Sequence, residues 1–392
     1  MVDLDRLVPP DVRRRLVALR EDIHRHPEVG FAEHETSRRL YEALGELRPA
    51  GLERIAGTGV VARFRGREPA APVVAVRGDI DALPITEETG LPFASQRPGV
   101  MHACGHDVHA AWTVGVAHLM AREPAAGDVV VVLQPAEETG KGAAAVLASG
   151  ALSGVAAIFG AHVDRRFLVG QVVAQPGPLA ASADTFTITL RGTGAHAARP
   201  HEGADPVVGA GALIGALQTV IARRVNPSVP AVVTVGTVHA GTASNIIPDC
   251  ATLSGTLRAV DPDTRSLLHA EVRRLAEGIA AAHGLRAEVA IDVGPPPIVN
   301  PSREVAWAQR AAERVLGERA VVPLGSLNLA AEDFACYLER IPGCFLRIGA
   351  REAGGASIPA HSPRFYAAHE SIFVGAAVLA ETARVASAEL MR

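Results

Sequence analysis

The sequence predicts an α/β protein in which a mainly parallel sheet is covered by helices on both faces and a second domain is inserted. Short apolar runs alternate with helical segments up to about residue 180. The pattern then changes to strands around two long helices, and helices return after residue 294. Because 392 residues can form two cores, we expect a discontinuous first domain, residues 1–180 and 294–392, and an inserted domain, residues 181–293.

The expected strands of the first domain are near-continuous apolar runs, which are typical of strands buried on both faces. They are Val73–Val76, Val129–Leu133, Ala156–Gly160 and a run near Cys344–Ile348. The expected helices have apolar residues at helical spacing. They cover residues 12–26, 33–46, 107–121, 141–149, 303–316 and 369–388.

The inserted domain is expected to have the order β-α-β-β-α-β, the ferredoxin-like arrangement. Its strands are Asp184–Leu190, Ala231–His239, Cys250–Arg258 and Arg286–Val293, and its helices are residues 204–223 and 262–283. The proline cluster Pro295–Pro297 closes this domain.

Composition and charge exclude several classes of protein. Apolar residues make up 48% and charged residues 20%, which excludes intrinsic disorder. The net charge is −4 without a long block of like charge, so we expect neither a nucleic-acid nor a membrane partner. The acidic first six residues do not resemble a secretory signal, and no apolar run approaches the ~18 residues that span a bilayer. Four scattered cysteines do not form a disulfide framework, which favours a cytoplasmic protein.

Polar residues capable of catalysis follow the expected strands of the first domain, at the edge where open α/β sheets bind ligands. The segments are Gly78–Pro84, Met101–His109, Gln134–Gly140, His162 and Pro359–Pro363. Thiolate, imidazole and carboxylate in these segments are the ligands of a transition metal.

The triplet Cys104-Gly105-His106 contains two of these ligand types, and its glycine allows the tight turn that would direct both to one metal. Taken alone, the triplet is also compatible with a buried free cysteine beside a capping histidine. A structural zinc site is less compatible, since it requires four ligands at short spacings.

The pair Glu137-Glu138 suggests a division of roles, because neighbouring side chains in extended chain point to opposite sides. One carboxylate can bind metal while the other takes the proton of an attacking water and passes it to the leaving amine. The alternative is a solvated helix N-terminus, where acidic residues are favoured in any case.

Together these motifs resemble the M20 metallopeptidase family, and within it the amidohydrolase branch of hippurate hydrolases, bacterial aminoacylases and auxin-conjugate hydrolases. The resemblance extends in order from Ile23–Glu28 to His361–Pro363. It is carried by Met-His-Ala-Cys-Gly-His-Asp, Gly-Asp-Ile-Asp-Ala-Leu-Pro, Gln-Pro-Ala-Glu-Glu and Gly-Ala-His-Ala-Ala-Arg-Pro-His.

The resemblance implies that the first domain is a catalytic domain with two divalent metal ions per subunit. The implied ligands are Cys104, His106, Glu138, His162 and His361, with Cys104 between the ions. Glu137 would be the general base and acid. Asp79, Asp81, Asp107 and His109 would either orient ligands or serve only as caps and buried hydrogen-bond partners. Thiolate and imidazole favour zinc, while manganese, cobalt and nickel stay open.

The resemblance also implies that the inserted domain is a lid and a dimerisation surface, so that the protein is a homodimer or a dimer-based oligomer. His196 would stabilise the oxyanion in the partner subunit's site. Asn245 would position the substrate, and Arg258 would bind its carboxylate. One departure from the branch is that the Glu-Asp-Phe of Glu332–Phe334 lacks the preceding serine, which indicates a different substrate pocket nearby.

The function implied is that of a metallo-amidohydrolase acting on linear amides, which hydrolyses N-acyl amino acids to a carboxylic acid and an amino acid. The alternatives are a dipeptidase or aminopeptidase of the same fold, and a binding paralogue that has lost activity. The ligands and the base are all present, which disfavours the paralogue.

Overall fold

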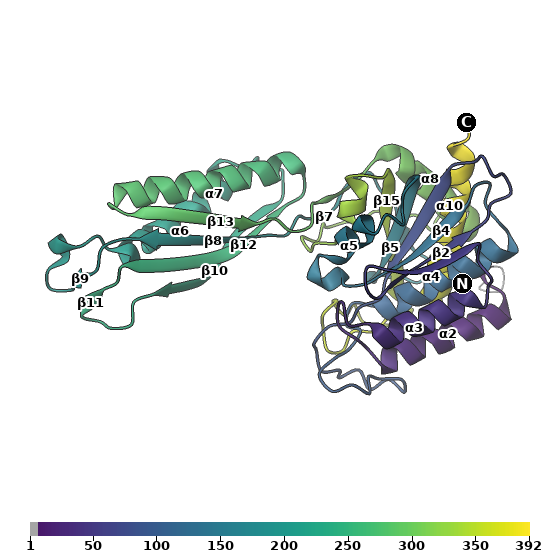
Figure 1. The fold of residues 1–392 in the computed structure, drawn as a ribbon. Helices are drawn as coiled ribbons and strands as arrows, with labels where there is room; N and C mark the ends of the chain where they lie inside the picture. Colours follow the sequence, from purple (N-terminus) through teal and green to yellow (C-terminus); the bar gives the residue numbers. More distant parts are fainter. Residues whose placement is uncertain (1–6) are drawn as a thin grey trace. The chain divides into compact units, whose positions relative to one another are not determined.

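A seven-stranded sheet with the order β1-β2-β4-β3-β5-β15-β6 forms the centre of the first unit of the chain (Figure 1). The computed structural model describes residues 7–392, so the acidic first six residues considered above lie outside the described part. The four central strands run parallel, which confirms the expected mainly parallel sheet. They are β4 (Val129–Gln134), β3 (Val73–Asp79), β5 (Val155–Leu168) and β15 (Gly343–Arg351).

The edges of this sheet are antiparallel and contain short strands that the apolar pattern did not predict. They are β1 (Gly51–Ile55), β2 (Gly59–Phe64) and β6 (Val172–Val173). In β1 the two central residues, Glu53 and Arg54, are exposed, so the strand has no continuous apolar run. Such a strand is stabilised by pairing with the other strand of its hairpin, so its own composition does not predict it.

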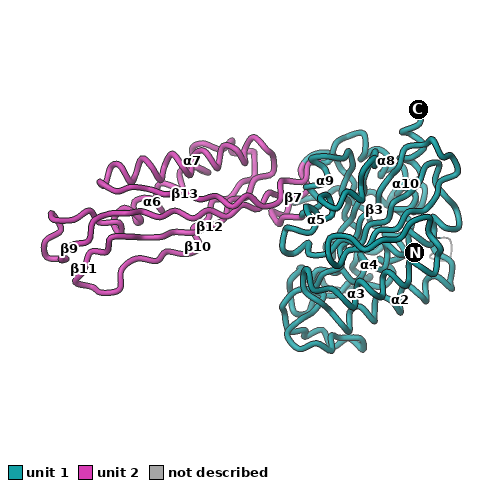
Figure 2. Tube along the Cα trace, in the orientation of Figure 1, with its two compact units in different colours: residues 1–177, 300–326, 333–392 teal, residues 178–299, 327–332 magenta. Residues whose placement is uncertain are grey.

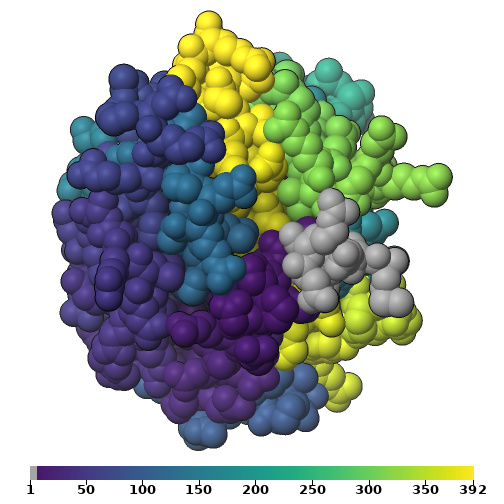
Figure 3. Space-filling model, turned by 90° about the vertical axis from the view of Figure 1, so that its right-hand side faces the viewer, coloured from purple at the N-terminus to yellow at the C-terminus, as the bar shows by residue number. Residues whose placement is uncertain are grey.

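Helices cover both faces of the sheet, as expected. On one face, Val74 and Val76 of β3 share a core with α4 (His106–Arg122) and α10 (Glu370–Glu389). The same layer contains α2 (Pro10–Arg25), α3 (His34–Gly45) and α8 (Ser302–Leu316). The opposite face has α5 (Gly142–Ala148) and α9 (Ala335–Leu338). In Figure 3 the purple N-terminal part of the chain meets the yellow C-terminal part. Arg13 of α2 lies over the ring of Phe373 of α10.

The second unit contains a four-stranded antiparallel sheet with the order β10-β12-β8-β13. Its elements follow the expected β-α-β-β-α-β order: β8 (Asp184–Arg191), α6 (Pro206–Arg223), β10 (Ala231–Ala240), β12 (Cys250–Ala259), α7 (Pro262–Ala282) and β13 (Arg286–Asp292). An aspartate side chain caps the first backbone N–H groups of each helix, and a proline is the first helical residue. Both are common at helix N-termini.

Short ribbons complete the fold and were not predicted. The pair β9 (Ala195–His196) and β11 (Ile246–Ile247) forms a two-stranded ribbon in the second unit. Another pair joins β7 (Gly177–Ala180) to β14 (Ile298–Asn300). Two 3-10 turns are η1 (Glu137–Thr139) and η2 (Pro200–Glu202).

The two units are discontinuous in sequence (Figure 2). The first consists of the chain up to Gly177 together with Asn300–Ser326 and Asp333–Arg392. The second consists of Pro178–Val299 and the short segment Leu327–Glu332. The chain therefore passes between the units at four points.

Two helices, α6 and α10, are long and apolar enough to cross a membrane by length and composition, although the sequence analysis expected no such segment. In α10, 83% of the apolar 18-residue stretch is buried inside the protein, because the helix packs against α4 and the sheet of the first unit. In α6 the buried share is 33%, and Val207 and Val208 are exposed. Length and composition alone do not identify a membrane span, since core helices meet the same criteria.

Candidate metal centre

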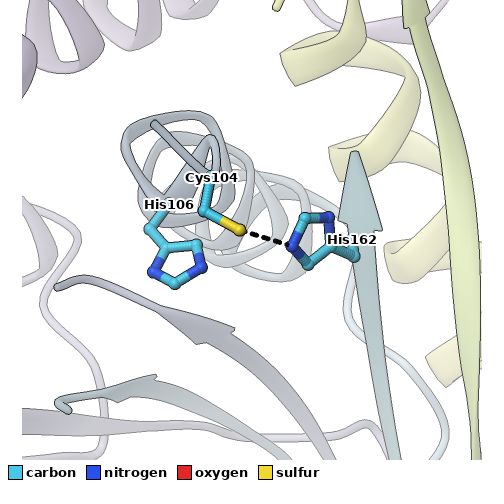
Figure 4. Close-up of side chains that lie close together, drawn as sticks. All are labelled: Cys104, His106 and His162. Atoms are coloured by element: carbon cyan, nitrogen blue, oxygen red, sulfur yellow. Dashed lines mark hydrogen bonds between the residues drawn. The ribbon is translucent and has the colours of Figure 1, made fainter. Parts of the chain in front are cut away.

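The five expected metal ligands come from four segments at the carboxyl ends of the parallel strands. Cys104 and His106 lie at the start of α4, and Glu138 lies in the 3-10 turn that follows β4. His162 is on β5, and His361 is in the loop between β15 and α10. Figure 4 shows His106 and His162 on either side of the Cys104 sulfur, which lies 3.2 Å from His162 Nε2.

These side chains form two clusters that share Cys104. Ligand atoms of Cys104, His106 and His162 all lie within 4.8 Å of one another, and so do those of Cys104, Glu138 and His361. A further cluster joins His106 to Glu137 and Glu138. Thiolate, imidazole and carboxylate at these separations match the ligand preferences of zinc and similar ions. A shared cysteine between two clusters is the arrangement that a bridging ligand requires.

Gly105 allows the side chains of Cys104 and His106 to point toward the same cluster. Its φ of +87° lies in the left-handed region that glycine tolerates. A Cβ atom at this position would lie 2.5 Å from Cγ2 of Val163, so a larger residue would also collide with β5. The tight turn expected from the sequence is therefore present.

Hydrogen bonds fix the tautomers of both buried imidazoles. His106 Nδ1 lies 2.9 Å from the carbonyl oxygen of Asp81, and His162 Nδ1 lies 2.7 Å from that of Val163. A carbonyl can only accept, so we assign the proton to Nδ1 in each ring, which leaves the Nε2 lone pair facing the cluster. His106 Nε2 is buried without a hydrogen-bond partner among the described residues. An orphaned nitrogen among carboxylates fits a bound cation.

The electrostatic surroundings also suit a cation. Burial alone would lower the pKa of His106, but the carboxylates of Asp79 and Asp81 outweigh it and raise that pKa. Burial and the negative charge of Glu138 raise the pKa of the Cys104 thiol, so a nearby cation is needed to keep it as a thiolate. Burial lowers the pKa of His162, which keeps this imidazole in the neutral form that binds metals.

Three buried polar residues, Asp79, Asp81 and His109, contact the segments that contain the expected ligands. The sequence left open whether they orient ligands or only cap the backbone. Asp81 accepts hydrogen bonds from His106 through its carbonyl and from the Glu138 N–H through Oδ2, at 3.0 Å. Asp79 Oδ1 accepts from His109 Nδ1 at 2.6 Å, and His109 Nε2 accepts from the Val163 N–H. Their contacts favour the orienting role over a simple capping role.

Asp107, the residue after His106, binds the N-terminal helix. Its Oδ2 accepts hydrogen bonds from Arg20 at 2.8 Å and from His24 at 2.9 Å. Burial alone would lower the pKa of His24, but Asp107 and Glu87 raise it to about 9. The motif around His24 thus stabilises the start of α4 and does not contribute a ligand.

Glu137 is held apart from Glu138. Its Oε1 accepts a hydrogen bond from the Asp333 N–H at 3.3 Å, while its Oε2 lies 3.9 Å from His106 Nε2. Glu138 Oε1 instead lies 3.2 Å from His361 Nε2. The preceding Ala136 has a φ of +55°, and its N–H donates to Glu33 Oε1 at 2.8 Å. Both carboxylates lie about equally far from His106 Nε2, at 3.9 and 4.0 Å, but Glu137 is bound by the Asp333 N–H and Glu138 by His361.

A buried arginine beneath the site was missed by the sequence analysis. Arg77 donates from Nε to Gln134 Oε1 at 2.8 Å, from Nη1 to Asp79 Oδ2 at 2.5 Å and from Nη2 to Asp333 Oδ1 at 2.9 Å. All four side chains are fully buried. The available signal was an arginine directly after the apolar run Val73–Val76 and two residues before Asp79, because a charge in a buried strand must be paired.

Of the residues predicted in the second unit, two lie together and one lies apart. His196 and Asn245 are exposed at the β9–β11 ribbon, where the Ala197 N–H donates to the Asn245 carbonyl at 3.0 Å. Arg258 is at the other end of β12, beside the Ser182 segment that enters this unit. From Cys250, next to the ribbon, to Arg258 the strand extends about 26 Å at roughly 3.3 Å per residue.

A parallel α/β sheet with two such ligand clusters at its carboxyl edge defines a metal-dependent hydrolase. Residues 75–385 match the family described as Peptidase family M20/M25/M40. An N-acetylcysteine deacetylase of Bacillus subtilis (strain 168) is 41% identical over 372 residues, covering 94% of this chain and 96% of the relative. The chain therefore belongs to the M20 peptidase family, and the resemblance seen in the sequence is confirmed.

Two further proteins are similar over nearly the whole chain, and one of them is described as an M20 member. Thermostable carboxypeptidase 1 of Saccharolobus solfataricus is 34% identical over 389 residues, covering 96% of this chain and 97% of that one. A crystal structure of a Bacillus subtilis protein described as a dinuclear metal binding peptidase from the M20 family superposes with a TM-score of 0.87 at 37% identity. It covers 97% of this chain and 99% of its own. The protein is a hydrolytic enzyme that acts on amide bonds in a metal-dependent reaction.

Proposed function

We propose that the enzyme hydrolyses the amide bond of N-acyl amino acids and releases a carboxylic acid and an amino acid. The observation that carries this proposal is the position of the Glu137 carboxylate beside two clusters of metal-ligand side chains that share Cys104. Such a centre can hydrolyse both peptide bonds and acyl-amide bonds. The deacetylase named above supports an N-acyl substrate. Because one relative is a carboxypeptidase, a peptidase of the same fold is the alternative function.

The proposed metal ligands are Cys104, His106, Glu138, His162 and His361, and Cys104 would contact both of two divalent ions. When bound, such ions would polarise the scissile carbonyl and increase the acidity of a water molecule. The mixed thiolate, imidazole and carboxylate set favours zinc, with manganese, cobalt and nickel as the alternatives.

Glu137 would take a proton from the water that adds to the amide carbon. It would then pass this proton to the nitrogen as the C–N bond breaks, so that the amine leaves neutral. His196 would donate a hydrogen bond to the carbonyl oxygen as its negative charge develops. Arg258 would pair with the substrate carboxylate, and Asn245 would position the substrate.

We propose that the active enzyme is a homodimer or a dimer-based oligomer in which His196 acts in the partner's site. Distances within the second unit support this proposal. A substrate the size of two residues spans at most about 7 Å. The β9–β11 ribbon, which contains His196, is separated from Arg258 by most of the length of β12. If both His196 and Arg258 contact one substrate, they come from different chains. The four cysteines are free, which supports the proposed cytoplasmic location.

The metal-loaded enzyme should release amine from an N-acetyl or N-benzoyl amino acid and not from the matching free dipeptide. A panel that varies the acyl group and then the amino acid, with amine release as the readout, tests this. The Glu137→Gln variant is the control for amine release that does not depend on this carboxylate, and metal-free enzyme is the control for metal-independent release. Hydrolysis of the free dipeptides alone would identify a peptidase, and inactivity toward both would identify a binding paralogue.

Mixing two inactive variants should restore activity if the site is completed across the dimer. In a heterodimer of His196→Ala with Glu137→Gln, one of the two sites combines an intact Glu137 with the partner's intact His196. With random exchange about half of the dimers are mixed, so activity should reach roughly a quarter of wild type. Native mass spectrometry verifies the exchange. No recovery after complete exchange would show that His196 does not act across the dimer.

A further inference from the structure

Arg165 is a buried arginine on β5, shortly after His162, and it belongs to neither ligand cluster. Its side chain is 1% exposed. A guanidinium so buried needs partners for its donors, because an unpaired buried charge is strongly destabilising. Those partners are all in one segment of the chain.

The segment runs from Ala350, near the end of β15, to the start of α10. Arg165 Nη1 donates to the Ala350 and Tyr366 carbonyls at 3.3 and 3.0 Å. Nε and Nη2 donate to the Ala356 carbonyl at 3.2 and 2.7 Å. Nη1 and Nη2 also pair with the two oxygens of Glu352, at 3.0 and 3.3 Å. One side chain thus ties the beginning, the middle and the end of this segment to β5.

Two further contacts reinforce this arrangement. The Arg165 guanidinium lies 4.1 Å from the centre of the Tyr366 ring, and the Tyr366 hydroxyl donates to Glu352. Burial alone would raise the pKa of Glu352, but the hydrogen bonds from Arg165 and Tyr366 lower it to about 2. The Glu352 carboxylate is therefore ionised and paired with Arg165 at neutral pH.

The same segment contains His361, which is the most exposed of the five proposed ligands. Its side chain is 54% exposed, whereas the other four are buried or nearly so. Its φ is +65°, a region that costs a residue other than glycine about 1–3 kcal/mol. The His361 N–H donates to the Ala103 carbonyl at 2.8 Å, next to Cys104. A strained residue in an irregular loop stays in place only when the loop around it is held.

We propose that Arg165 is a positioning residue that holds the His361 loop and thereby sets the affinity of one of the two metal sites. The inference rests on the proposed function, because it takes His361 as a ligand. In the cluster of Cys104, His106 and His162, the two histidines lie on α4 and β5 and are held by backbone carbonyls outside this loop, those of Asp81 and Val163. The effect should therefore be confined to the site of Cys104, Glu138 and His361.

Arg165→Met should weaken binding of one zinc ion per chain by about 10–100-fold and leave the other unchanged, as expected for loss of a residue that orients a ligand. Metal-free protein is dialysed against buffered zinc over a range of free concentrations, and bound zinc is measured by elemental analysis. Arg165→Lys keeps the charge but not the planar fork, so it should give an intermediate affinity. The matched control is Arg166→Met, because Arg166 is adjacent, 35% exposed and paired with Asp164.

His361→Ala is measured in parallel, so that failure of the inference can be separated from failure of the ligand assignment. If His361→Ala loses one zinc and Arg165→Met binds two with wild-type affinity, Arg165 has no positioning role and the assignment stands. If His361→Ala itself binds two zinc ions like wild type, the assignment of His361 is wrong. Equal weakening of both sites in Arg165→Met would indicate general damage to the fold and overturn the inference. If Arg165→Met does not fold, Tyr366→Phe, which keeps the ring and removes one hydrogen bond, should show the same selective loss on a smaller scale.

Discussion

Replacing Glu137 by glutamine will lower kcat by about 10²–10⁴-fold while the amount of bound metal stays the same. Glutamine keeps the shape of the side chain and can still meet the Asp333 N–H, but it cannot accept the proton of the attacking water. Steady-state kinetics and elemental analysis of the same preparation measure the two quantities. KM should change little, because Glu137 is not proposed to hold the ground-state substrate.

The matched control for this variant is Glu138→Gln, the same substitution one residue further on. Glu138 lies beside His361 and faces away from the Asp333 N–H, so this change should release metal. Metal loss of equal extent in both variants would contradict the division of roles between the two carboxylates.

Replacing Arg77 by methionine should destabilise the first unit by about 3–5 kcal/mol, because it leaves two fully buried carboxylates, Asp79 and Asp333, without their cation. Both tryptophans of the chain, Trp112 and Trp307, lie in the first unit. Tryptophan fluorescence during urea unfolding of the metal-free protein therefore follows that unit.

The control for this variant is Arg63→Met on β2, a strand of the same sheet. Arg63 pairs with Asp128 at 3.2 Å but is 39% exposed, so its loss should cost less than about 1 kcal/mol. Similar losses for Arg63 and Arg77 would show that the buried cluster contributes no more than a surface ion pair.

The fold was predictable where hydrophobic periodicity determines it. The strands β3, β4 and β15 and the helices α4 and α10 are buried apolar segments, and their positions follow from the sequence to within a few residues. The edge hairpin β1–β2 was not predicted, since two residues of β1 are exposed and the strand has no apolar run. The ribbon β9–β11 was not predicted, since it is short, partly exposed and pairs residues that are distant in sequence. β5 continues well beyond the apolar run that predicted it. Polar residues in its second half, such as Arg165, are hydrogen-bonded to other parts of the first unit.

The candidate site was predictable where reactive residue types follow strand ends. Residues predicted from four separate segments form the clusters described above, in which Cys104 lies within 4.8 Å of His162 in one cluster and of His361 in the other. Arg77 and Arg165 were missed because their partners, Asp333 and the loop after β15, are distant in sequence. Pattern reasoning identifies groups that react, whereas the residues that hold them in place depend on tertiary contacts.

The parallel pairing of β5 with β15 has a consequence for the order of folding. Ile158 pairs with Gly343, and nearly all of the second unit lies between them in sequence. During synthesis the second unit can fold from mostly contiguous chain, whereas β15 must emerge late and insert beside a strand made much earlier. The long loop closed by this pairing makes it a slow step. His361, which follows β15, then reaches Cys104 only after almost the whole chain has left the ribosome, so the second ligand cluster is completed last.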